Sequence, residues 1–252
     1  MSRLSDLLLE FVPDAKQVVE GGLLQPMGEI RALVKGKVEK VVPARGGPPE
    51  SRADRENSGH TYNPTTPGTF TLGEGSAVVT NAWKFSQVAN GTVVRDTGTD
   101  VEFQRAGKWV SVRRLKIPLT RGEVLLQTTV ALVARDRADG VLTPAQATEE
   151  IRRAKAASAF HALPPEWIIN DFGKEGFRLE GTKGDIIHTT PETDDAKTAV
   201  QESDLTLSHG CIHILAEDRQ QLIEKGYLRG GVKIRVHPYD PVRLSRWGKR
   251  PP

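Results

Sequence analysis

The sequence has a single cysteine, no long apolar run and no secretory signal. Cys211 is the only cysteine among 252 residues, so an intrachain disulfide is impossible. No segment approaches the roughly 18 consecutive apolar residues that a membrane-spanning helix needs. Near the N-terminus, Leu7-Leu8-Leu9 is followed at once by Glu10 and no basic stretch precedes it, unlike a signal peptide. We expect no transmembrane segment, and either a mature chain, export by another route, or a protein that stays inside the cell.

A strong excess of one charge is also missing. Lys and Arg number 35 and Asp and Glu 32, which gives a formal net charge of +3. The basic residues are dispersed, whereas a nucleic-acid binder usually concentrates them in a stripe. We therefore expect no nucleic-acid partner, although a mild positive excess would suit an anionic polymer such as a bacterial cell wall. With 37% hydrophobic and 27% charged residues, the composition predicts a globular fold.

Apolar periodicity predicts a mainly β chain with one or two helices. Short alternating runs between glycine-containing turns are typical of strands, and the regular strand–helix alternation of a parallel α/β sheet is missing. The strands are expected on both sides of Lys35-Gly36-Lys37 and over 65–72, 93–94, 101–103, 109–112, 123–133, 177–179, 185–188, 205–214 and 232–236.

The predicted helices are few. Leu4 to Glu20 is expected to form a short amphipathic helix that is broken near Pro13. Thr143 as an N-cap, with Pro144 at the first helical position, predicts a long helix up to Ala159. A further helix is expected over 217–225, ending at Gly226.

Cys211 is the candidate nucleophile, within Ser208-His209-Gly210-Cys211-Ile212-His213. If this segment is extended, alternation places His209, Cys211 and His213 on one face. A thiol is only slightly ionised at neutral pH and needs an imidazole or a positive field to attack. Gly210 removes side-chain bulk beside an approaching substrate and lets a backbone N–H point at an oxyanion. Ser208 and His209 can hydrogen-bond across the turn.

His188 is the predicted distant base for this thiol. It ends the apolar run Ile186-Ile187. Thr189 follows and can offer a backbone carbonyl or a hydroxyl that fixes the imidazole tautomer. His60 and Tyr62, in the polar loop before the turn at Thr65, are expected near a substrate groove.

These residues resemble the motif of the L,D-transpeptidase family with the YkuD-like catalytic domain. Ile187-His188-Thr189-Thr190-Pro191 is similar to its Ile-His-Gly-Thr-Pro element, and Ser208-His209-Gly210-Cys211-Ile212 to its Ser/Thr-His-Gly-Cys-hydrophobic element. Thr65-Thr66-Pro67-Gly68-Thr69-Phe70 resembles the upstream Thr-Pro-x-Gly-x-Phe element, with Thr66 where proline is usual. The resemblance covers roughly 28–236.

The resemblance implies a β-sandwich-like catalytic fold and an acyl transfer on peptidoglycan stem peptides. Cys211 would attack an L-centre-to-D-centre peptide bond, with His188 as base. Gly210 and Cys211 would hold the oxyanion through their N–H groups, and His209 would shape the pocket. Ser208 and His213 would contact the substrate. No metal or organic cofactor is implied, and the expected location is periplasmic or otherwise extracytoplasmic.

The same resemblance suggests three parts for the chain. Residues 1–28 would be an N-terminal extension and 237–252 a C-terminal tail. Residues 29–236 would form the catalytic domain, with a β-meander and helix inserted at about 95–170, which matches no part of the family.

Two further departures from the family motif stand out. His213 occupies a position where Arg or Asn is usual. The loop between His188 and Ser208 is longer than usual and acidic, so we expect a lid. Its acidic residues are Glu192, Asp194, Asp195, Glu202 and Asp204.

Three alternatives stay open from the sequence. An enzyme of the same fold could transfer the acyl group to water, as an L,D-carboxypeptidase, or exchange D-amino acids. It could also be a delivered antibacterial effector with an immunity or delivery partner. His188, His209, Cys211 and His213 could instead bind zinc, since Cys and His are its preferred ligands. A non-catalytic module that binds the cell wall is the third alternative.

Overall fold

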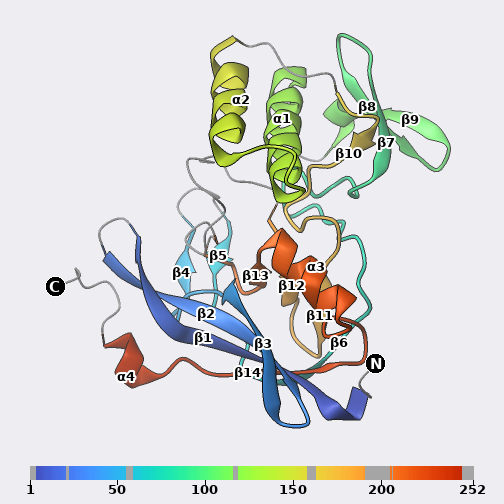
Figure 1. Cartoon of the computed structure of the whole chain (residues 1–252). Helices are drawn as coiled ribbons and strands as arrows, with labels where there is room; N and C mark the ends of the chain where they lie inside the picture. Colours follow the sequence, from blue (N-terminus) through green and yellow to red (C-terminus); the bar gives the residue numbers. More distant parts are fainter. Residues whose placement is uncertain are drawn as a thin grey trace. The chain divides into compact units, whose positions relative to one another are not determined.

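The computed structural model divides the chain into two compact units, which are described separately (Figure 1). It describes residues 4–20, 23–54, 59–115, 119–157, 163–190, 205 and 207–245. Unit 1 comprises Met1–Gly75, Gly176–His188 and Gln201–Pro252, and unit 2 comprises Ser76–Glu175 and Thr189–Val200. The three parts expected from the sequence stay a prediction, because a compact unit is not by itself a functional domain.

Unit 1 is built around a closed β-barrel with the strand order β1-β14-β6-β11-β12-β13-β3-β2. The pairs β1–β14 and β12–β13 are parallel and the other neighbours are antiparallel. The strands are β1 (Leu7–Glu20), β2 (Leu23–Val34), β3 (Lys37–Arg45), β6 (Gly68–Leu72), β11 (Phe177–Glu180), β12 (Ile186–His188), β13 (Ile212–Ile214) and β14 (Lys233–Val236).

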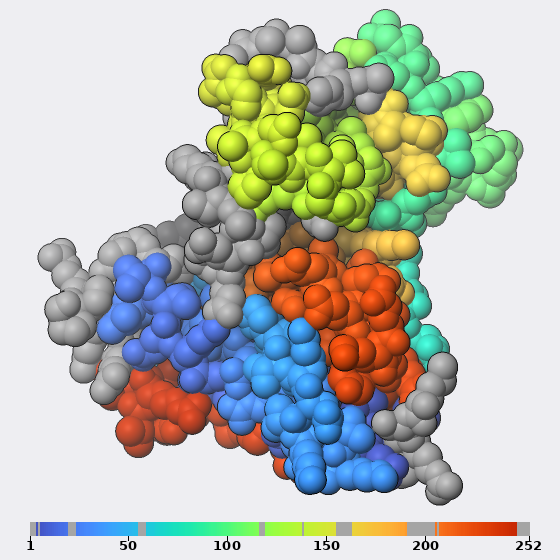
Figure 2. All heavy atoms as spheres, viewed as in Figure 1, coloured from blue at the N-terminus to red at the C-terminus, as the bar shows by residue number. Residues whose placement is uncertain are grey.

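Alternate residues of these strands fill the barrel. Ile187 on β12 and Ile212 and Ile214 on β13 belong to its buried core. The helix α3 (Ala216–Glu224) follows β13 and adds Leu222 to the same core. Lys40 on β3 donates a hydrogen bond to Gln221 on α3 at 2.7 Å, and the two elements adjoin on the face seen in Figure 2. Because the interior is packed with aliphatic side chains, the neighbouring residues of β12 and β13 point to the outside of the barrel.

The helix expected over Leu4–Glu20 is wrong, because the segment forms β1 after a short 3-10 turn at Leu4–Asp6. Leu7, Leu9 and Phe11 are buried and the residues between them are only half-buried, which is the period of a strand. Pro13, which would break a helix, lies where the register with β2 shifts. Pairing with β2 and β14 decides the conformation of this segment.

The start of the expected C-terminal tail packs against β1. The backbone N–H of His237 donates to the Phe11 carbonyl at 2.9 Å. The N–H of Asp240, the N-cap of α4 (Pro241–Leu244), donates to the buried Asp14 carboxylate at 2.7 Å. These contacts join the two ends of unit 1 that the structure describes.

Unit 2 combines a small antiparallel sheet with a helix pair. The sheet has the order β10-β7-β8-β9, made of β7 (Thr92–Asp96), β8 (Val101–Arg105), β9 (Lys108–Ser111) and β10 (Glu166–Trp167). A 3-10 turn at Val112–Arg114 follows β9. The helices α1 (Arg121–Ala138) and α2 (Pro144–Ala157) lie side by side (Figure 1). Trp167, Val94 and Phe103 are members of the buried core of this unit.

The strand expected over 123–133 is wrong, because these residues form most of α1. Val124, Thr128 and Ala131 are buried at helical spacing. The overlooked signal is the pair Thr120 and Glu123, which forms a capping box at the start of the helix. The apolar run suggested a strand, but the cap and the packing of one helical face determine a helix.

The mainly β fold class is confirmed, with four α-helices among the described residues where one or two were expected. Confirmed elements are the strand pair that turns at Lys35 and Gly36, the β7–β9 meander, β6, β11, β12, α2, α3 and β14. Lys35 and Gly36 both have positive φ, 50° and 78°, as a two-residue turn between antiparallel strands requires. No helix within the described residues is long and apolar enough to cross a membrane.

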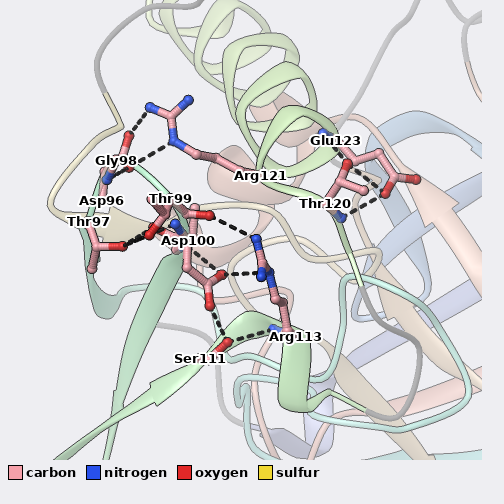
Figure 3. Close-up of polar contacts among 11 residues, drawn as sticks. Asp96, Thr97, Gly98, Thr99, Asp100, Ser111, Arg113, Thr120, Arg121 and Glu123 are labelled. Carbon is pink, nitrogen blue, oxygen red and sulfur yellow. Dashed lines mark hydrogen bonds and ion pairs between the residues drawn. The ribbon is translucent and has the colours of Figure 1, made fainter.

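Polar contacts at the start of α1 connect it to the β7–β8 turn (Figure 3). Arg121 binds Asp96 through two hydrogen bonds of 3.0 and 2.7 Å, which lower the pKa of Asp96. Thr120 accepts a hydrogen bond from the Glu123 N–H at 3.2 Å, and its own N–H donates to the Glu123 carboxylate at 2.9 Å. A hydrogen bond from Lys84, together with those from Thr120, lowers the pKa of Glu123 from 4.5 to about 2. The resulting contribution to stability is therefore present above about pH 4.5 and is lost as the pH falls through about 2.

Replacing Thr120 with alanine removes one half of the capping box. We expect Thr120→Ala to lower the free energy of unfolding of unit 2 by about 1 kcal/mol, and Thr120→Ser to keep most of it. Urea unfolding followed by tryptophan fluorescence measures this, because Trp83, Trp109 and Trp167 all lie in unit 2. Thr99→Ala, in the β7–β8 turn, is the control. Equal midpoints for Thr120→Ala and the wild type would contradict the assigned cap.

Candidate active site

The parallel pairing of β12 with β13 organises the candidate site on the outside of the barrel. Ile187 is paired with Ile212, and His188 with His213. Directly paired residues of neighbouring strands point to the same side of a sheet. Since Ile187 and Ile212 face the interior, His188 and His213 face outward together. Cys211 immediately precedes β13 and is two residues from His213.

Two histidines and an arginine form one row across this outer face. The rings of His188 and His213 meet edge to face, with centroids 4.7 Å apart and an interplanar angle of 71°. His213 is in turn paired with Arg45 on β3. All three residues are buried, at 3%, 8% and 3% exposure. The guanidinium of Arg45 donates to the Leu205 carbonyl at 2.9 Å, so the chain before the Ser208 motif is fixed to the same row.

The Cys211 thiol lies one residue before β13, beside Ile186, which is the first residue of β12. Cys211 is half-buried. Burial, with a smaller contribution from the nearby Asp185 carboxylate, raises the pKa of the Cys211 thiol to about 11. A hydrogen bond from the Ile186 backbone N–H and the charge of Arg178 act in the opposite direction and lower it. Without substrate, the thiol is therefore protonated at neutral pH.

The expectation that His209, Cys211 and His213 share one face of an extended strand is wrong. Only Ile212–Ile214 form β13. Gly210 has φ +131°, a conformation that side-chain-bearing residues rarely adopt. An added Cβ at Gly210 would lie 3.3 Å from Asp185 Oδ1. The chain therefore bends before Cys211, and this bend turns His209 away from the strand face of His213.

His209 instead packs against a short hairpin made of β4 (Arg52–Ala53) and β5 (Thr61–Tyr62). Its ring stacks on Tyr62 with centroids 4.0 Å apart and an angle of 17°. The ring of His60 stands edge-on to His209 at 6.0 Å. The hairpin thus brings both loop residues nominated from the sequence to the nucleophile motif.

Asp54 is the polar partner of His209, and the sequence did not indicate it. Nε2 of His209 lies 2.9 Å from the Asp54 carboxylate, whose side chain is 1% exposed. A buried carboxylate needs a hydrogen-bond donor or a cation, and the imidazole provides one. Asp54 N–H also donates to the His60 carbonyl at 3.1 Å, which closes the hairpin. Asp54 therefore fixes the orientation of His209 by linking it to β4–β5.

The upstream element that begins with Thr65 and Thr66 contacts the chain at Cys211 and at Asp185. Thr65 Oγ1 donates to the Cys211 carbonyl at 3.5 Å and accepts from the Gly47 N–H at 3.1 Å. The Thr66 N–H donates to Asp185 Oδ2 at 2.9 Å. Thr66, at the position where the similar L,D-transpeptidase element usually has proline, thus supplies a backbone donor that proline lacks. This contact holds the carboxylate that faces Gly210.

The turn around Gly210 is held by Ser208. Ser208 is fully buried, and its N–H donates to the Gly46 carbonyl at 3.2 Å. The Gly210 N–H donates to Ser208 Oγ at 3.0 Å. The N–H group that the resemblance assigns to an oxyanion is therefore engaged within the turn, and Ser208 would have to release it when substrate binds.

Thr189 lies beside Gly173 of unit 2. Thr189 is buried, and an added Cβ at Gly173, which has φ +66°, would approach Thr189 Oγ1 to 2.0 Å. Its role toward the His188 tautomer stays a prediction. The predicted acidic lid, with Glu192, Asp194, Asp195, Glu202 and Asp204, lies outside the described residues.

The geometry does not support the zinc alternative. It needs His188, His209, Cys211 and His213 in one cluster, but His209 bonds to Asp54 while His188 faces His213. In the part of the chain that the structure describes, no three His, Cys, Asp or Glu side chains are grouped to hold a metal ion. Asp54, Asp185 and Arg178 also lie near the thiol motif, and sequence reasoning missed them because only the fold brings their side chains to it.

Unit 2 contains a separate groove of about 440 Å³. Its lining includes Gln87, Thr92, Phe103 and Arg105. It contains none of the residues nominated from the sequence, so it is distinct from the thiol site.

No family model matches the chain, and no curated protein matches it significantly. Among solved structures, it is similar to an L,D-transpeptidase from Xylanimonas cellulosilytica (TM-score 0.38, 10% identity) and one from Mycobacterium smegmatis (TM-score 0.33, 14% identity). A third match is an L,D-transpeptidase in complex with imipenem (TM-score 0.31, 12% identity). Each match covers 92% of this chain but only 60%, 58% and 58% of the other chain. At these TM-scores the matches carry no argument about activity.

The raised pKa of the thiol gives a prediction for alkylation. With a pKa of about 11, the thiolate fraction at pH 7 is about 10⁻⁴ and rises roughly tenfold for each pH unit. The rate of Cys211 labelling by iodoacetamide should therefore still be rising at pH 10. Glutathione, an exposed thiol, is the control and should level off above about pH 9. A plateau for Cys211 below pH 8 would mean that a thiolate exists at rest.

Proposed function

We propose that the chain is a cysteine acyltransferase of the L,D-transpeptidase type that acts on peptidoglycan stem peptides. The observation that carries the proposal is the parallel pairing of β12 with β13, because it sets His188 on the same outer face as His213, two residues after Cys211. The Ser208-His209-Gly210-Cys211 and Ile187-His188-Thr189-Thr190-Pro191 elements support it from the sequence.

Acylation begins with attack of Cys211 Sγ on the carbonyl carbon of the L-to-D peptide bond. His188 accepts the thiol proton as the S–C bond forms, so the thiol need not be ionised beforehand. This accords with a resting thiol whose pKa is about 11. The tetrahedral intermediate then collapses, the C–N bond breaks, and His188 returns the proton to the departing amine. The product is a thioester on Cys211 and a free D-residue.

Deacylation reverses these roles. An amine or a water molecule attacks the thioester carbonyl, His188 accepts a proton from the attacking group, and the S–C bond breaks as Cys211 regains a proton. An amine from a second stem gives a cross-link, a free D-amino acid gives exchange, and water gives L,D-carboxypeptidase activity.

The residues around Cys211 and His188 have three roles in the proposed acyl transfer. His209 and Gly210 shape the turn that presents the thiol, with the oxyanion held by the Gly210 and Cys211 N–H groups. His60 and Tyr62 border the stem peptide through the hairpin that packs on His209. His213 supports the His188 ring. Since the substrate is a cell-wall polymer, we place the activity outside the cytoplasm, in the periplasm or an equivalent compartment.

Purified muropeptides with tetrapeptide stems test the proposal by product mass. We expect loss of the terminal D-residue, dimers or exchanged D-residues with the wild type, and no product with Cys211→Ala. His188→Gln should reduce the rate by 10²- to 10⁴-fold, the usual contribution of a general base. His213→Asn restores the residue common in the family and should stay active.

His237→Gln is the matched control, because His237 is a half-buried histidine of unit 1 that contacts Glu10 and lies outside the site. Product formation by Cys211→Ala, or equal rates for His188→Gln and His237→Gln, would refute the proposed roles. Unchanged masses with the wild type and several donor stems would refute the proposed activity.

A further inference from the structure

A second row on the outer face of the barrel runs from β11 to the thiol. Arg178 on β11 is paired with Ile186 on β12. Since Ile187 is paired with Ile212 in the parallel β12–β13 pair, the next row back places Ile186 beside Cys211. The Ile186 N–H contact with the thiol agrees with this register. Arg178, Ile186 and Cys211 therefore lie in one line on the same side of the sheet.

The separation of Arg178 and Cys211 suits a short ligand. Neighbouring strands are about 4.8 Å apart, so backbones two strands apart are separated by about 10 Å. An arginine side chain extends over much of that distance. The charge of Arg178 acts on the Cys211 thiol, which is consistent with this proximity. If the thiol attacks a carbonyl of a bound peptide, a group bound by the guanidinium would therefore lie about one amino-acid residue further along that peptide.

Arg178 differs from three other arginines on the sheets, each of which forms an ion pair with a carboxylate. Arg31 pairs with Glu29, Arg235 with Glu10 and Arg95 with Glu102. Arg178 is exposed, and no carboxylate among the described residues forms an ion pair with its guanidinium. Asp185, the carboxylate that acts on the same thiol, accepts a hydrogen bond from the Thr66 N–H. The guanidinium therefore has donors available for a ligand.

Asp185 also determines on which side of the thiol an anion can bind. Its carboxylate lies against Gly210, so it repels a second anion on the Gly210 side. The positive charge of Arg178 lies on the opposite side, toward β11. An anionic substrate group beside the thiol is thus directed to Arg178.

We propose that Arg178 binds the terminal carboxylate of the acyl donor, the carboxylate of the D-residue that leaves. This inference rests on the proposed function, because it assigns a group of that substrate. A guanidinium binds a carboxylate through two parallel hydrogen bonds, which a lysine cannot reproduce. The carboxylate of the leaving residue is one residue beyond the scissile carbonyl, which matches the spacing of the row. Arg178 selects donors that end at this residue.

Two matched donors test the inference: a disaccharide tetrapeptide with its free terminal carboxylate, and the same muropeptide with a C-terminal amide. For each variant, kcat/KM is measured with both donors. We expect the wild type to prefer the acid at least tenfold, Arg178→Gln to bring the ratio of acid to amide close to one, and Arg178→Lys to give an intermediate ratio. Arg31→Gln, on β2 of the same barrel, should keep the wild-type ratio.

The ratio separates binding of the carboxylate from other effects of Arg178. Loss of its charge near the thiol lowers the rates with acid and amide donors alike, so it leaves the ratio unchanged. If Arg178→Gln keeps the wild-type preference, or if the wild type has none, the inference is overturned while the proposed function stands. If the wild type turns over neither donor nor any other stem peptide, the proposed function fails and the inference fails with it.

Discussion

The parallel pairing of β12 with β13 is the constraint on which the candidate site depends. It fixes Ile187 and Ile212 inside the barrel, and the alternation of the strands then sends His188 and His213 outward. A shift of one residue would bury the histidines in the aliphatic core and expose the isoleucines. The register is thus set by burial of apolar side chains far from any chemistry, and the chemical groups follow from it.

Loops from distant parts of the chain complete the site around the β12–β13 pair. They form few direct bonds with the segment that carries Cys211. Thr65 contacts the Cys211 carbonyl, Asp54 fixes His209, and Asp185 faces Gly210. The thiol itself is surrounded by protein, so its pKa is raised rather than lowered. A nucleophile of this kind depends on a base during reaction and stays unreactive between turnovers. The bend at Gly210 is what makes this arrangement possible, because it separates the direction of His209 from that of His213.

The sequence predicted the mainly β class, most short strands and the segments that carry Cys211, His188, His60 and Tyr62, because local alternation and turn residues report these features. It mistook Leu4–Glu20 for a helix and residues 123–133, most of α1, for a strand, since pairing across the barrel and a capping box overrode the apparent pattern. It could not identify Asp54, Asp185 or Arg178. Asp54 and Arg178 lie in segments without a motif, and only the β4–β5 hairpin and the strand register bring them to the thiol. Asp185 begins the predicted strand that carries His188, but the sequence does not show that its carboxylate lies against Gly210.

Detection of the acyl-enzyme tests the central claim most directly. The protein is mixed with a tetrapeptide muropeptide, quenched in acid within the first turnovers, and measured by intact mass and peptide mapping. The predicted result is a thioester on the peptide that contains Cys211. The mass added to that peptide equals the mass of the donor minus the mass of the free D-amino acid that leaves. Turnover of the donor with Cys211 unmodified throughout, or an adduct on another residue, would contradict the account.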